Sequence, residues 1–147
     1  MANTIGFFNS YLIRQWTGGA NLSATVRACL LSAGWTPDRD TSDFDTSISA
    51  FVAESASGGD AIRQCASPGG GNQVTLSATN VVKFDLSDVV FTASSGVNLD
   101  GQYVVLIEST GSIPIAYYEI STASVAATQL LVTWPDPIFE TSANVAP

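Results

Sequence analysis

Histidine is absent from this chain of 147 residues. Its absence removes the commonest general base, the Ser-His and Cys-His nucleophile pairs, and most zinc and non-haem iron sites. Catalysis by Asp and Glu alone remains open, as in glycosidases, but carboxylates are sparse here. We therefore expect a protein that is not an enzyme, with no catalytic residues, no metal ligands and no cofactor.

Basic residues are also scarce, with five Lys and Arg against 13 Asp and Glu and a net charge of −8. Nucleic-acid binding depends on clustered Lys and Arg that neutralise phosphates. The basic residues are scattered singly, at Arg14, Arg27, Arg39, Arg63 and Lys83. We expect no nucleic-acid partner. Only 12% of the residues are charged, about half the usual share, so the surface is rich in hydroxyl and amide groups.

Cysteines and long apolar runs are few as well. Cys29 and Cys65 form no CxxC motif and no disulfide framework, and Cys29 fits a small buried apolar residue within a strand. The longest apolar run, residues 103–107, is far too short to span a membrane. No basic region followed by an apolar block opens the chain. We expect a soluble protein made in the cytoplasm, with no membrane partner.

The N-terminal residues have helical spacing. Ile5, Phe8, Leu12 and Trp16 follow one helical stripe, and two glycines at 18–19 end it. This pattern predicts an amphipathic helix within residues 1–19 that packs on the core. The stripe is rich in aromatic residues for a short helix, so a second interpretation is that it partly docks on a neighbouring chain.

Residues 20–73 contain one predicted strand, at 24–32, followed by a loop with four aspartates. An EF-hand loop that began at Asp38 would need glycine and glutamate where the chain has Asp43 and Ser49. The alternative is that Asp40 or Thr41 caps a short helical turn. We favour the cap. The glycine-rich segment after residue 45 is predicted to be a mobile connection or a long arm.

From residue 74 onward the pattern alternates strand and turn. Apolar and β-branched runs separated by turn residues predict six strands. They span residues 73–79, 81–86, 89–93, 102–110, 113–121 and 130–134. The fold class is therefore mainly β: antiparallel sheets arranged like a β-sandwich, with one N-terminal helix (α+β overall). Residues 1–147 are expected to form a single domain with a β-rich core at 74–147.

The stretch "VVKFDLSDVVFTASSG", residues 81–96, contains the only lysine. Phe84 and Leu86 are even-numbered apolar positions, whereas Val89 and Phe91 are odd-numbered. Since side chains alternate along a strand, this change of phase requires a bulge or tight turn between them. The nearby carboxylates then belong to a strand corner, with Asp88 as its cap, and the stretch is a surface rather than an active site.

Five sequence stretches follow one another along the chain in a characteristic order and spacing. They are "IGFFNSYLIRQW", "LLSAGWTPDRDTSDF", "VVKFDLSDVVF", "YVVLIES" and "TWPDPIFET". In this layout the chain resembles a family of short virion structural proteins of tailed bacteriophages. The resemblance covers nearly the whole chain, but residues 50–71 depart from it. Where such proteins tend to have a Gly- and Tyr-containing stretch, this segment has no tyrosine.

The resemblance implies a virion component without a reaction or cofactor. We expect a capsid decoration (cement) protein on the outer head surface, synthesised in the host cytoplasm, because a strongly acidic subunit suits a surface away from packaged DNA. The expected partners are the major capsid protein and other copies of the chain, as a trimer. The predicted interface residues are Phe7, Phe8, Tyr11, Trp16 and Trp35.

Two alternatives remain open at this point. The first is a tail or head-tail connector component. The second is a carbohydrate-binding module on the virion surface, which would bind glycans through exposed Trp16, Trp35 or Trp134.

A first prediction concerns metal dependence. Because no ligand spacing for a cation was found, thermal unfolding with and without EDTA should coincide. A melting temperature several degrees lower in EDTA would contradict this expectation and identify the Asp38–Asp45 loop as a calcium site.

Overall fold

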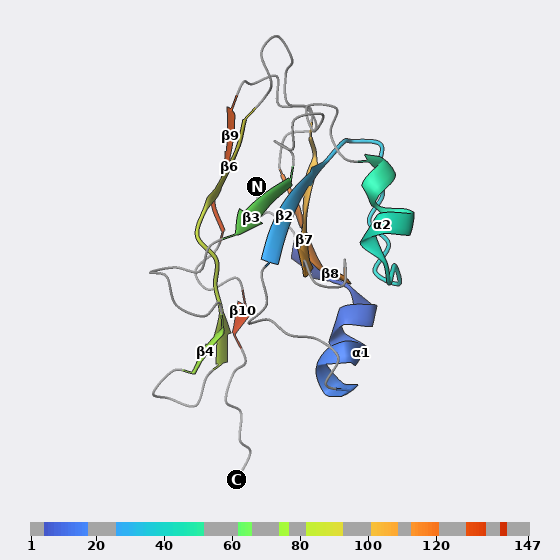
Figure 1. The fold of residues 1–147 in the computed structure, drawn as a ribbon, viewed down its shortest axis with the longest axis vertical. Helices are drawn as coiled ribbons and strands as arrows, with labels where there is room; N and C mark the ends of the chain where they lie inside the picture. The colour runs from blue at the N-terminus through green and yellow to red at the C-terminus, as the bar shows by residue number, and fades with distance from the viewer. Residues whose placement is uncertain are drawn as a thin grey trace.

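The fold is that of a computed structural model (Figure 1). The residues that it describes are 5–17, 26–51, 62–65, 74–76, 82–92, 101–108, 113–120, 129–134 and 139–140. All statements below concern these residues.

The first layer is a five-stranded antiparallel sheet. Its strand order is β1 (Ile5–Phe7), β8 (Ile113–Glu119), β7 (Tyr103–Glu108), β2 (Val26–Leu31) and β3 (Ile62–Cys65). The predicted hairpin of β7 and β8 forms its centre, and β2 lies beside β7 as a buried strand. Strands with near-continuous apolar sequences occupy positions that are covered on both faces.

The second layer consists of two short antiparallel ladders that follow one another. β5 (Val82–Phe84) pairs with β4 (Val74–Leu76) and β10 (Phe139–Glu140), while β6 (Val89–Thr92) pairs with β9 (Gln129–Val132). β6 follows β5 after only residues 85–88, and β10 follows β9. These are two separate small sheets, one of three strands and one of two, and together they run along the left side of Figure 1.

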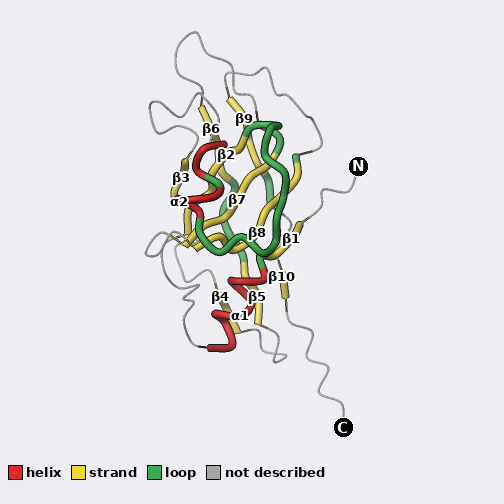
Figure 2. Tube along the Cα trace, turned by 90° about the vertical axis from the view of Figure 1, so that its right-hand side faces the viewer, coloured by secondary structure: helices red, strands yellow, loops and turns green. Residues whose placement is uncertain are grey.

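The central sheet is covered on both faces. On one face, Tyr118 of β8 packs edge-on against Trp134, which follows β9, with ring centroids 5.8 Å apart. On the other face, Tyr117 packs against Trp35 at 5.8 Å. Adjacent strand residues point to opposite faces, so these two contacts identify the two covering layers. Figure 2 shows α2 (Phe44–Ser47) and the preceding loop in front of the strands on the Trp35 side.

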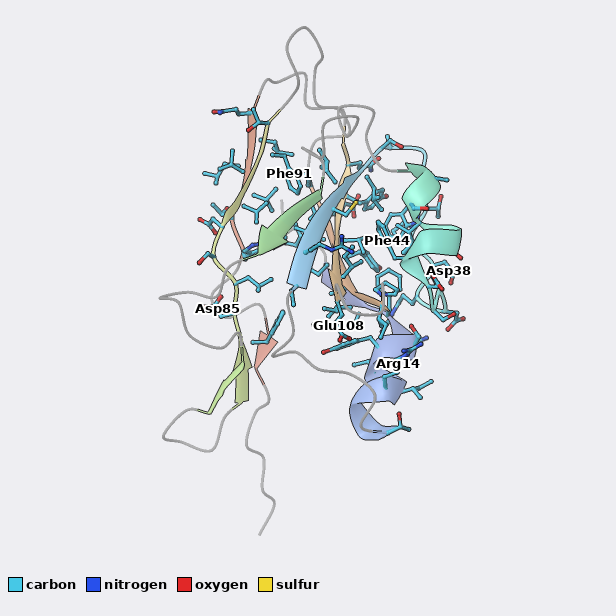
Figure 3. All side chains as sticks on the ribbon, viewed as in Figure 1. Arg14, Asp38, Phe44, Asp85, Phe91 and Glu108 are labelled. Atoms are coloured by element: carbon cyan, nitrogen blue, oxygen red, sulfur yellow. The ribbon has the colours of Figure 1, made fainter. Side chains whose placement is uncertain are left out.

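The buried core fills both interlayer spaces. Phe91 points from β6 toward the central sheet, and Phe44 points from α2 toward its other face (Figure 3). Strand residues such as Leu30 and Val104 are fully buried between them. The prediction of a mainly β fold with two antiparallel sheets and one short N-terminal helix is confirmed.

The N-terminal segment differs from its prediction in two ways. Residues 5–7 form strand β1, and the helix α1 spans only Asn9–Thr17. The strand forms because Gly6 lies opposite Tyr117 on β8, where a β-carbon would lie 2.2 Å from the tyrosine ring. Leu12 is 39% exposed, so the predicted core-facing stripe does not extend along the helix.

Part of the predicted arm is also ordered. Residues 62–65 form β3, which extends the central sheet by pairing antiparallel with β2. The sequence pattern did not predict this short strand, because glycines and other turn residues dominate the surrounding segment. The remainder of the predicted arm, apart from residues 45–51, lies outside the described residues.

A second prediction tests the direction of side chains on β6. Phe91 is fully buried whereas its neighbour Val90 is 44% exposed. Phe91→Ala should lower the free energy of unfolding by about 3–5 kcal/mol, because it leaves a cavity between the sheets. Val90→Ala should change it by less than about 1 kcal/mol. Urea denaturation of both variants measures the difference, and equal losses would show that the strand faces are assigned wrongly.

Candidate interaction surfaces

The aromatic residues predicted as an interface lie mostly in the core. Phe8, Tyr11 and Trp35 are 0%, 1% and 4% exposed. This corrects the prediction for these three residues, because a side chain enclosed by its own chain offers no surface to another. Phe7 is half-buried against the core. Trp16 belongs to α1, but its side chain lies outside the described part of the structure.

The buried aromatic rings gather around Trp35. Its indole lies 6.5 Å from Phe8, 5.1 Å from Tyr103 and 5.8 Å from Tyr117, centroid to centroid. The contacts with the two tyrosines are edge-to-face, the arrangement that aromatic pairs favour. Burial raises the pKa of the Tyr103 phenol, and neighbouring Glu119 and Tyr117 raise it further. The cluster is therefore a neutral packing centre that joins the N-terminal segment to the sheet.

The aspartate-rich loop holds the start of α1. The Nδ2 of Asn9 donates to Oδ1 of Asp40 at 2.8 Å, and the backbone N–H of Asn9 donates to the carbonyl of Arg39 at 2.8 Å. In return, Nε of Arg39 donates to the Phe7 carbonyl at 2.8 Å. Asp38 accepts the backbone N–H of Asp40 at 3.0 Å. Asp40 thus binds α1. The cap by Asp40 or Thr41 of the turn that follows stays a prediction.

Neither a cation site nor a membrane-spanning helix is found in the described ranges. There, no three His, Cys, Asp or Glu side chains gather as metal ligands. Within the same residues, no helix is long and apolar enough to cross a bilayer.

The first exposed apolar surface is on α1. Ile13 is 63% exposed and Leu12 is 39% exposed. Ile13 lies one helical turn after Asn9, on the side of the helix that contacts Asp40. We call Leu12 and Ile13 the α1 patch. Charges of both signs lie near it, because Asp40 bonds to Asn9 at the start of the helix, Arg39 bonds to the Phe7 carbonyl, and Arg14 follows Ile13 in the helix.

The second exposed apolar surface is on β6 and β9. Val90 and Leu131 lie directly opposite each other in the ladder and are 44% and 58% exposed. Their strand neighbours Val89 and Val132 point inward and are buried. We call the outward side of this pair of strands the ribbon face. It is separated from the α1 patch, because α1 lies at the lower end of the molecule in Figures 1 and 2 and the ribbon lies in the upper part.

The corner at residues 85–88 lies where the change of phase was predicted, but Asp88 bonds to a residue far along the chain and is not shown as a local cap. Oδ1 of Asp88 accepts the backbone N–H of Trp134 at 3.1 Å, and the indole Nε1 of Trp134 donates to the Ser87 carbonyl at 3.1 Å. Asp85 is half-buried, and its Oδ1 accepts the backbone N–H of Leu86 at 2.9 Å. The side chain of Lys83 lies outside the described part of the structure.

Two polar groups in the central sheet were not anticipated. Glu108 is only 6% exposed, and its Oε2 has no hydrogen-bond partner. Nε of Arg27 is likewise buried without a partner. Glu108 lies opposite Val26 and Arg27 lies opposite Ile107, so the two side chains point to opposite faces of the sheet and do not pair. Both residues occupy regular positions in the alternating pattern of their strands, so the sequence pattern did not distinguish them from their neighbours.

Comparisons with protein-family models, with curated proteins and with solved structures returned no match. The resemblance to phage virion proteins therefore stays a prediction.

Two of the three tryptophans considered for carbohydrate binding are buried. Trp35 and Trp134 are 4% and 8% exposed, and both pack edge-to-face with tyrosines inside the chain. A glycan platform needs an accessible ring face, so neither residue serves as one.

A third prediction concerns Cys29, which is a free, fully buried thiol. Burial raises its pKa from 9.0 to about 12, although nearby Arg27 partly opposes the shift. At pH 8 roughly one molecule in 10,000 then carries the reactive thiolate. Iodoacetamide should leave Cys29 unmodified in the native chain and alkylate it rapidly in urea, as measured by peptide mass spectrometry. Alkylation of the native thiol at the rate seen in urea would contradict the buried position.

Proposed function

We propose that this chain is a bacteriophage virion structural protein that decorates the outer surface of a capsid. The observation that carries the proposal is the presence of two separate exposed apolar surfaces, the α1 patch and the ribbon face. A protein that stabilises a shell must contact more than one neighbour at once. Two surfaces on different sides of a β-sandwich-like fold meet that requirement.

The composition of the surface supports the same proposal. The chain carries a net charge of −8, and a subunit of this charge would be repelled by the phosphates inside a packed head. Exposed positions near both surfaces are rich in hydroxyl and amide groups, among them Asn9, Thr17, Gln129 and Thr133. Such groups suit the wet contacts that are common between protein subunits.

The mechanism that follows is avidity. Each copy would contact a coat subunit and a second neighbour, so that many modest contacts together oppose expansion of the shell. Copies placed at threefold positions of the capsid would form trimers, with the coat lattice setting the symmetry. No reaction and no cofactor enters this mechanism.

A tail or head-tail connector component is the second candidate. The same pair of surfaces suits a ring, in which each copy contacts two neighbours through different patches. Copy number separates the two candidates. Hundreds of copies per virion on a quantitative gel indicate decoration, whereas about six or twelve indicate a connector.

A fourth prediction tests capsid binding and the role of the α1 patch. The purified chain should bind bare mature capsids of the phage that encodes it, with little loss between roughly 50 and 500 mM salt, because few charges are available to screen. Ile13→Asp should weaken binding at least about tenfold, since it places a charge in the apolar contact. Ala50→Asp, which adds the same charge at an exposed position near α2, is the control and should bind normally.

Capsid stability provides an independent measurement. Capsids bound by the wild-type chain should withstand heat better than bare capsids, because a ligand of the assembled shell stabilises it by mass action. If the chain binds tails but not capsids in the same assay, the connector takes the place of decoration. If Ile13→Asp binds as well as Ala50→Asp, the α1 patch is not the contact.

A further inference from the structure

We draw no further inference here: the strongest candidate, the exposed apolar ridge of Val90 and Leu131 on the ribbon face, carries none, because nothing in the structure shows what covers it.

Discussion

The hydrogen-bonded corner between β5 and β6 determines how the second layer faces the first. The strand changes phase between Leu86 and Val89, yet the apolar residues on both sides of the change are buried. This requires the backbone to bend at a fixed place. Asp88 and the Ser87 carbonyl both bind Trp134, so the bend on one strand is held by the partner strand. The Trp134 ring then packs on Tyr118, which ties the corner to the central sheet.

This joint has a consequence for the exposed surface. Since side chains alternate, a corner that directs Phe91 inward also directs Val90 outward, and the ladder places Leu131 beside it. A slip of one residue would exchange the buried and exposed sets and place Val90 and Leu131 in the core. The apolar ridge of the ribbon face is thus a consequence of the same hydrogen bonds that close the sandwich. The buried partners fix its position.

The sequence predicted well those elements that are set by local alternation. The β7–β8 hairpin, β2 and the break at Ser87–Asp88 could be predicted because apolar periodicity and turn residues agree there. β1 could not, because its pairing depends on the fit of Gly6 beneath Tyr117, a contact more than a hundred residues away in sequence. β3 was hidden for a similar reason, since a four-residue strand among turn residues is stabilised by its partner and not by its own pattern.

The candidate surfaces show a sharper limit of sequence reasoning. Periodicity identifies which residues share a face of a helix, but it does not say which part of that face the rest of the chain will cover. The aromatic residues of the N-terminal segment were expected to contact a partner. Instead, Trp35 in a loop distant in sequence packs against Phe8, which is buried within the chain. Among the described side chains of that segment, the exposed large apolar ones are aliphatic, Leu12 and Ile13.

Both exposed apolar surfaces lie next to an aspartate that the fold itself uses. Beside the α1 patch, Asp40 accepts a hydrogen bond from the Asn9 side chain and so holds the start of the helix. At the base of the ribbon face, Asp88 accepts the backbone N–H of Trp134 and holds the corner. In each case a carboxylate that stabilises the fold also places a charge near apolar side chains that remain exposed, Ile13 in one case and Val90 in the other. The hydrogen bonds that fix the position of each surface therefore also set the charge at its edge.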